Sequence, residues 1–295
     1  MTGSNHTGRI SGHQAASGQF ADITSQCFIN APFEQLRQGL LPLFLAHRLR
    51  PEIGLEGDCL WTARRDEFQA VADQLHEHGL ACTLHAPFSD LAPGAADRRI
   101  REITRDKLRR AFELAGVFQA RAIVCHLGYD DRKGSYKFDD WLRHSLETWN
   151  ELLDLAAMSN TPVMLENTYE RTPEIHRALL TELAGRDIGF CLDVGHLTAY
   201  AHSTWQVFLD TLLPWLRHLH LHDNNGERDE HIAIGQGCFP FQELFAFLRQ
   251  QQLSLLFTLE PHSEKDLWQS LQAIAEMRLF SPQFPLASAG RPEKS

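Results

Sequence analysis

The chain has 295 residues, of which 43% are hydrophobic and 22% are charged, and its formal net charge is −10. This length and apolar content suffice for one large α/β domain with a closed core. The acidic balance, with no long basic tract, argues against a nucleic-acid-binding protein, which ordinarily presents a positive surface to phosphates. Bound divalent ions would offset part of this charge, so the exclusion is not strict.

The cysteines and the chain ends indicate where the protein resides. Six cysteines occur without Cys-x-x-Cys spacing, and several fall in apolar runs such as 123–125 and 190–192. This pattern predicts buried, reduced thiols and a cytoplasmic protein. No run reaches the ~18 apolar residues of a membrane span, and the N-terminus lacks a basic-then-apolar signal pattern. We therefore expect no membrane association and no obligate protein partner.

Composition divides the chain into three parts. Residues 1–18 are rich in small and polar side chains, which predicts a disordered lead-in. Residues 19–283 carry the periodic apolar patterns of a catalytic domain, and residues 284–295, with two prolines, are expected to form a flexible tail.

Within the central part, short apolar runs alternate with amphipathic stretches, as in a parallel sheet with helical crossovers. The expected strands are 23–29, 51–56, 80–85, 121–126, 162–166, 187–193, 217–222 and 254–260. The expected helices are 33–46, 65–78, 97–119, 138–158, 173–184, 203–215, 240–250 and 264–279. In the third of these, the apolar stripe consists of Ile100, Ile103, Leu108, Ala111, Phe112 and Ala115. The regular alternation, without a Gly-rich turn after any strand, predicts a single (β/α)8 TIM barrel in preference to a doubly wound sheet.

Most of the expected strands end on a side chain that can bind a metal. The strand-end residues are His85, His126, Glu166, Asp193 and Glu260, while the seventh strand carries His220 and His222. The loops that follow strands six and seven add His196, Asp229 and His231. Because the carboxyl ends of parallel barrel strands converge on one rim, we expect these groups to share one pocket.

Imidazoles and carboxylates in this number point to a cluster of metal ions. Zinc, manganese and iron accept such ligands, and the many histidines favour zinc. This number of groups, even without His222, exceeds the needs of one ion, which predicts two to three divalent ions per chain. A lone histidine or glutamate at a strand end is more often an ordinary rim residue. Burying this many carboxylates together without metal, however, would cost several kcal/mol each.

The short segments around these residues resemble the xylose isomerase-like barrel superfamily, and within it the endonuclease IV (AP endonuclease family 2) branch. The matching segments are 85–87, 126–128, 165–168, 193–196, 220–223, 229–231, 234–237 and 259–261, in the same order along the chain. The resemblance implies a three-zinc site whose ligands are His85, His126, Glu166, Asp193, His196, His220, Asp229, His231 and Glu260. Sugar isomerases and epimerases of the superfamily keep a reduced set around one Mn²⁺-type ion, which here matches Glu166, Asp193, His220 and Glu260.

Two departures bear on the substrate. His222 stands where endonuclease IV usually has Asn, and the segment 167–174 lacks the glycine usual in the DNA enzymes. With the acidic charge, these differences argue against abasic DNA. Segments 88–95 and 126–130 instead resemble cobamide-remodelling phosphodiesterases, which cut the nucleotide loop of a cobamide.

We therefore predict a metal-dependent hydrolase of a small phosphodiester such as the cobamide nucleotide loop. In this hypothesis the ions bind the phosphate and activate a water, while Glu166 or Glu260 holds or deprotonates it. The expected substrate contacts are Glu56, Asn167, His222 and Arg98. The alternatives are a sugar (phosphate) isomerase or epimerase with one divalent ion, an abasic-site DNA endonuclease, and a barrel that only binds a ligand.

Overall fold

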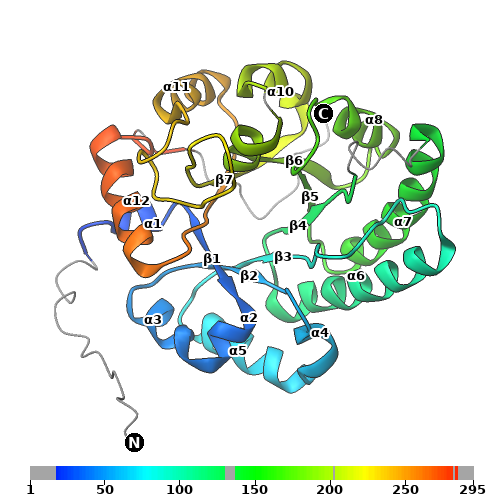
Figure 1. Ribbon diagram of the computed structural model, residues 1–295. Coiled ribbons are helices and arrows are strands. Elements are labelled where there is room, and N and C mark those ends of the chain that lie inside the picture. The colour runs from blue at the N-terminus through cyan, green and yellow to red at the C-terminus, as the bar shows by residue number, and fades with distance from the viewer. Residues whose placement is uncertain (1–17, 130–136, 202, 282, 285–295) are drawn as a thin grey trace, which may run out of the picture.

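The barrel strands follow one another around a closed ring in chain order. The structure is a computed structural model that describes residues 18–129, 137–201, 203–281 and 283–284. Neighbouring strands pair in parallel, and β8 pairs with β1 to close the barrel (Figure 1). This confirms the predicted single (β/α)8 barrel. The strands are β1 (Phe28–Pro32), β2 (Pro51–Gly54), β3 (Thr83–His85), β4 (Ile123–His126), β5 (Val163–Glu166), β6 (Ile188–Asp193), β7 (Leu216–Leu221) and β8 (Leu256–Leu259).

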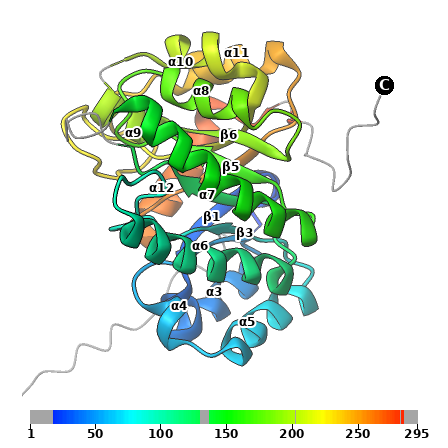
Figure 2. The same ribbon diagram turned by 90° about the vertical axis from the view of Figure 1, so that its right-hand side faces the viewer.

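The helices surround this ring, and the longest two, α6 and α7, lie side by side on its outer surface (Figure 2). The main helices are α2–α3 (Phe33–Gln35 and Leu41–Ala46, joined by the π-helical η1, Leu36–Leu40), α5 (Arg65–Glu77), α6 (Arg98–Phe118), α7 (Phe138–Met158), α8 (Glu174–Glu182), α10 (Trp205–Leu212), α11 (Phe241–Gln251) and α12 (Glu264–Met277). Their bounds agree closely with the expected ranges. Short helical turns that the sequence patterns did not predict are α1 (Ala21–Thr24), α4 (Cys59–Thr62), α9 (Val194–His196) and η3 (Leu197–Ala201), and α10 continues into η4 (Leu213–Trp215).

The first strand lies later in the sequence than predicted. Residues 21–24 form α1, and β1 begins only at Phe28. The Gln26 side chain donates to the Asp22 carbonyl at 2.7 Å and so closes this helical turn. The β-branched Ile23 and Thr24 suggested a strand, but local hydrogen bonding outweighs that preference here.

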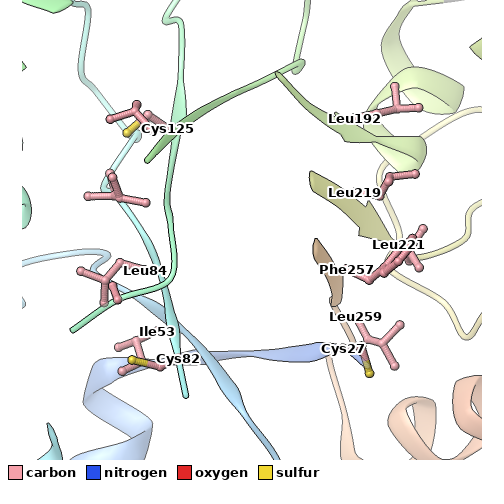
Figure 3. Packing of buried hydrophobic residues seen from close by; sticks show 14 of the residues in the cluster. Cys27, Ile53, Cys82, Leu84, Cys125, Leu192, Leu219, Leu221, Phe257 and Leu259 are labelled. Carbon is pink, nitrogen blue, oxygen red and sulfur yellow. The ribbon is translucent and has the colours of Figure 1, made fainter. Parts of the chain in front are cut away.

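The apolar interior has two separate parts. One lies between strands and helices, where strand residues such as Ile53, Leu84 and Leu219 face outward from the ring (Figure 3). The other lies inside the barrel and contains Phe28, Ala122, Val124, Met164, Cys191 and Leu256. This inner cluster closes the barrel below the strand ends, as expected of a packed interior rather than a pore.

The predicted surface and termini need adjustment at two places. Ile100 and Ile103 are 47% and 63% exposed, so the buried face of α6 begins at Thr104 rather than at Ile100. Phe284, assigned to the tail, is buried against Phe257 at a ring distance of 5.1 Å. The rest of the predicted lead-in and tail lies outside the described residues, Gly18 excepted.

Five cysteines are buried and Cys238 is exposed, all of them as free thiols. Among the described helices, none has the length and apolar character needed to cross a membrane.

Candidate metal centre

Inward-facing positions change from apolar to ionisable along several strands. On β4 and β5, Val124 and Met164 face the inner apolar cluster, and His126 and Glu166 follow two residues later. Successive side chains of a strand alternate between its faces, so residues two apart point the same way. The carboxyl ends of the strands therefore raise a layer of histidines and carboxylates directly above the apolar cluster.

Glu166, at the end of β5, is the centre of this layer. Its Oε2 atom lies 3.1 Å from Nε2 of both His85 and His126, and 3.4 Å from His220 Nδ1. Its Oε1 atom lies 3.0 Å from His196 Nδ1. The side chain is only 1% exposed, so four imidazoles rather than water surround this carboxylate. A carboxylate in such a position is suited to bridge two ions.

A second group lies beside Glu166, at the ends of β6, β7 and β8. His220 Nδ1 is 3.0 Å from Glu260 Oε1 and 3.8 Å from Asp193 Oδ2. The backbone of Asp193 is fixed from β5, because its N–H donates to Asn167 Oδ1 and its carbonyl accepts from Asn167 Nδ2, both at 2.9 Å. The four residues of the reduced ligand set are thus brought together.

A third group comes from the loop after β7. Asp229 Oδ2 lies 3.0 Å from His231 Nε2 and 3.3 Å from His196 Nε2. Asp223 holds this loop, because its carboxylate accepts hydrogen bonds from the backbone N–H groups of residues 235, 237 and 239. The structure therefore brings all nine predicted ligands into one continuous cluster.

The donor set fits divalent ions. Buried atoms inside the cluster have no hydrogen bond of acceptable geometry within the described part of the chain; they include Glu166 Oε1, His220 Nδ1 and Asp229 Oδ1. Buried polar atoms are normally satisfied, and unsatisfied ones in a native site call for an ion or water. Several overlapping sets of three residues have their donor atoms within 4.8 Å of one another, among them His85–His126–Glu166 and Glu166–Asp193–His220. Carboxylate oxygens and imidazole nitrogens are the ligands that zinc and manganese accept.

The electrostatics of the cluster reflect this crowding of opposite charges. Burial alone would lower the pKa of His85, but the neighbouring Glu166 and Glu56 raise it well above its usual value. Burial would likewise lower the pKa of His231, yet Asp229 and Glu260 raise it to about 9. Burial would raise the pKa of Glu166, but the surrounding histidines, His126 first, hold it well below its usual range. At His85, His231 and Glu166 the opposite charges thus stabilise each other's charged forms, whereas burial dominates at His126 and lowers its pKa.

An open pocket of about 290 Å³ lies over the cluster. Its wall includes two aromatic side chains, Phe88 and Tyr169, which are 40% and 38% exposed. Phe88 stacks on the His126 ring at a centroid distance of 4.2 Å. Among the described residues, no arginine or lysine lines the pocket. The lining residues are Asn30, Pro32, Gly54, Glu56, His85, Phe88, His126, Glu166, Thr168, Tyr169, His196, Tyr200, Asp229, His231, Glu260 and His262.

Of the four expected substrate contacts, only Glu56 lines this pocket. The side chain of Asn167 is 1% exposed and is engaged by the Asp193 backbone, so it positions β6 rather than substrate. His222 is 2% exposed, lies 3.1 Å from Asp193 Oδ1 and stacks beneath His231. Arg98 points into solvent on the first turn of α6 and pairs with Glu102 at 3.5 Å. We reassign these three residues accordingly.

Two residues near the cluster were not anticipated from the sequence. Glu52, in the middle of β2, is fully buried, with Oε1 3.0 Å from His220 Nε2. His262 lines the pocket and stacks on His231 at 4.1 Å. The signal for Glu52 is strand alternation, which places a carboxylate in an otherwise apolar strand on the same face as Gly54 and Glu56. His262 lies two residues beyond Glu260, outside any strand, and no spacing rule would have selected it.

Residues 52–281 match the sequence profile of the family described as Xylose isomerase-like TIM barrel. The chain belongs to this family. A curated relative, the uncharacterized protein MJ1311 of Methanocaldococcus jannaschii, is 28% identical over 200 residues, which cover 65% of this chain and 68% of the relative. The assignment to the endonuclease IV branch is not tested by this match and stays a prediction.

Solved structures of the same fold include sugar epimerases and a protein soaked with zinc. A D-tagatose 3-epimerase-like protein is 23% identical with a TM-score of 0.72, covering 85% of this chain and 97% of that one. The TTHB071 protein from Thermus thermophilus, soaked with ZnCl2, is 23% identical with a TM-score of 0.70, covering 90% and 100%. Several other similar structures, including a D-psicose 3-epimerase, are sugar epimerases by name. At these identities the likeness shows the fold alone.

Proposed function

We propose that this protein is a hydrolase of a small phosphodiester that works with two or three divalent ions, zinc foremost. The observation that carries the proposal is the position of Glu166, whose two oxygens face four imidazoles from four different segments of the barrel. A single ion held by the reduced set would leave His85, His126, His196, Asp229 and His231 without a purpose in the same cluster. Their presence favours a cluster of ions.

In this proposal the chain's residues hold the cluster and orient the reacting groups. Bound ions would supply positive charge for the phosphate and lower the pKa of a water. Glu166 bridges between the groups from β3, β4 and β7. Glu260, whose side chain is 8% exposed at the floor of the pocket, is placed to accept a hydrogen bond or a proton from a water there.

The same geometry makes Glu166 a poor base for a carbon-bound proton. Its oxygens lie 3.0 to 3.4 Å from imidazole nitrogens of four histidines, and the side chain forms part of the pocket floor. These features support its use as a bridging ligand, and with it the hydrolytic proposal.

The pocket wall supports a substrate with a planar or apolar part. Phe88 and Tyr169 offer exposed aromatic faces beside the cluster, on which a heterocycle could stack. A phosphate would meet positive charge only at the cluster, because no described lysine or arginine lines the pocket. A nucleotide loop, as in a cobamide, combines both features, whereas the acidic chain argues against long DNA.

A sugar epimerase or isomerase is the second candidate, and the names of the similar structures favour it over hydrolysis. Its specific support in this chain is the complete reduced set of Glu166, Asp193, His220 and Glu260. In that reaction Glu166 and Glu260 would move a proton from and to a substrate carbon.

A substrate panel separates the two. Enzyme loaded with zinc or manganese is incubated with a phosphodiester reporter, a cobamide, abasic DNA and a set of ketoses. We expect hydrolysis of a small phosphodiester, reduced at least about 100-fold by Glu166→Gln, since even a residue behind a metal ligand typically contributes 10–100-fold. Glu230→Gln is the matched control, because Glu230 adjoins Asp229 yet its carboxylate binds Asn225 at 2.8 Å.

The outcomes are distinct. Turnover of a ketose with all phosphodiesters inert would establish the epimerase and eliminate the hydrolase. Metal analysis adds a second criterion, since the proposal requires two to three ions per chain. A stoichiometry of one or fewer, unaffected by Asp229→Asn, would contradict the cluster.

A further inference from the structure

Glu52 is a carboxylate buried inside the barrel below the metal cluster. It is fully buried and does not line the pocket, so it cannot meet substrate. Its Oε2 atom accepts hydrogen bonds from Thr83 Oγ1 at 2.8 Å and Thr258 Oγ1 at 3.0 Å. Its Oε1 atom lies 3.0 Å from His220 Nε2. Strands β3, β7 and β8 thus each contribute a partner to this one side chain.

Burying a carboxylate in this position destabilises the fold, so its presence points to a role other than packing. Removing an ionised group from water is strongly unfavourable, and the described surroundings contain imidazoles but no lysine or arginine partner. The neighbouring inward positions on other strands hold Val124, Met164 and Leu256, which fill the barrel without any such cost. An apolar side chain would therefore suffice if only packing were required.

The orientation of His220 differs from that of the other histidines of the cluster. In three of them Nδ1 lies 3.0 Å from a backbone carbonyl or a hydroxyl and Nε2 faces a carboxylate of the cluster; these are His85, His126 and His231. His196 uses both nitrogens, with Nδ1 3.0 Å from the Asn167 carbonyl and from Glu166 Oε1, and Nε2 3.3 Å from Asp229 Oδ2. In His220 the ring is reversed. Its Nε2 faces Glu52, and its Nδ1 faces Glu260 and Glu166.

The reversal follows from where each histidine sits. In a histidine at a strand end, the ring nitrogen that faces away from the cluster can donate a hydrogen bond to a nearby loop carbonyl, which fixes the ring. We call this nitrogen the outer nitrogen. His220 lies within β7, where the backbone carbonyls are committed to the sheet, and its Nε2 faces the buried carboxylate of Glu52 on β2. Glu52 Oε1 lies 3.0 Å from that nitrogen, and neither of these two buried atoms has a hydrogen bond of acceptable geometry to another described residue.

We infer that Glu52 is a positioning residue, which fixes the ring orientation and tautomer of His220 so that Nδ1 is presented to the cluster. This inference rests on the metal-binding part of the proposed function, and not on which bond the enzyme changes. A carboxylate behind a histidine ligand holds the ring, places the proton on the outer nitrogen and makes the inner nitrogen a better donor. Thr83 and Thr258 in turn hold Glu52, and His218 Nε2 shares the Thr258 hydroxyl at 2.8 Å.

The test compares two substitutions in the same buried network. Glu52→Gln keeps the size of the side chain but removes the carboxylate, whereas Thr83→Val removes one hydrogen bond to it and leaves the carboxylate in place. Zinc affinity of the full-length protein is measured by competition with a chromophoric chelator. We expect Glu52→Gln to weaken the tightest ions by about 10–100-fold and Thr83→Val to have a much smaller effect.

A second measurement reports on the ring itself. Long-range ¹H–¹⁵N spectra of the zinc-loaded protein distinguish which imidazole nitrogen carries the proton, with His220 assigned from the spectrum of His220→Gln. In the wild type the proton should be on Nε2, and in Glu52→Gln this pattern should be lost. Melting temperatures of both variants show whether the barrel is intact.

The outcomes separate this inference from the proposed function. Wild-type zinc affinity together with an unchanged His220 spectrum in Glu52→Gln would overturn the positioning role. An equal loss of affinity in Thr83→Val and Glu52→Gln would also overturn it, because a general packing defect would then explain both. Zinc-loaded wild type that leaves every phosphodiester intact would refute the hydrolase alone, since neither the affinity nor the spectrum depends on turnover.

Discussion

The lower and upper halves of the barrel interior are built from the same strands but hold opposite chemistry. On β4, β5 and β8 the lower inward positions are Val124, Met164 and Leu256, packed in an apolar cluster. Two or four residues later the same faces present the ligand-type side chains of the rim, such as His126 and Glu166. The register of the barrel strands therefore determines the position of the inner apolar cluster and also that of the ligand-type side chains above it.

The comparison indicates how stability and function divide between the halves. The lower half is stabilised by burial of apolar surface, which requires no ligand. The upper half concentrates buried carboxylates and imidazoles, whose mutual attraction must offset the loss of hydration. Its contribution to stability should depend on what occupies it, and that of the lower half should not.

The largest expected effect is the loss of stability on chelation. If the cluster binds ions as proposed, the free energy of unfolding should rise by about 4 kcal/mol when free zinc exceeds its Kd a thousandfold. Urea unfolding with excess zinc and with a chelator measures this difference. Coincident curves under the two conditions would show that the upper half is stable without ions, which would contradict the comparison.

A buried histidine outside the cluster sharpens the comparison. His176 on α8 packs on Phe190 at a ring distance of 5.2 Å, and burial lowers its pKa to about 4, whereas carboxylates raise that of His231 to about 9. Between pH 6.5 and pH 4, His176 is protonated in the unfolded chain but stays neutral in the folded protein. Stability contributed by neutral His176 should thus be lost as the pH falls from 6.5 to 4, by at most about 3 kcal/mol.

His176→Gln removes this titration while keeping a polar side chain. Unfolding free energies of wild type and variant, measured from pH 7 to pH 4, should converge as the pH falls. The matched control is His78→Gln, at the exposed C-terminal end of α5, which replaces a surface histidine in the same way. A constant difference between His176→Gln and wild type across this range would refute the low pKa.

Sequence patterns predicted the architecture well because hydrophobic periodicity and strand alternation are local. They gave the wrong element or the wrong buried face where a local hydrogen bond, or the extension of a helix beyond its buried part, decided the structure. Residues 23 and 24 join a helical turn closed by Gln26, and Ile100 and Ile103 lie on the part of α6 that precedes its buried face. Neither effect is visible in the apolar pattern itself.

The site shows the same division. All nine expected ligands meet, because the strand ends of a parallel barrel converge on one rim together with the loops that follow them. The directions of individual side chains could not be predicted, since these depend on partners distant in the chain. Asn167 turns to the Asp193 backbone and His222 to the Asp193 carboxylate, so neither faces the pocket. Glu52 was missed for the same reason, because its role depends on a histidine 168 positions further along.

The smallest expected effect tests the lower half directly. Val124→Ala removes two methyl groups from the inner apolar cluster, directly below His126 on the same face of β4. We expect a loss of about 2 kcal/mol in the free energy of unfolding, from lost burial and the cavity left behind. Because no charged group is disturbed, the loss should be the same with zinc and with chelator, and the number of ions bound should not change. A larger loss of unfolding free energy in zinc than in chelator would show that the inner apolar cluster also positions the ligand side chains above it. The two halves would then have to be treated as one unit.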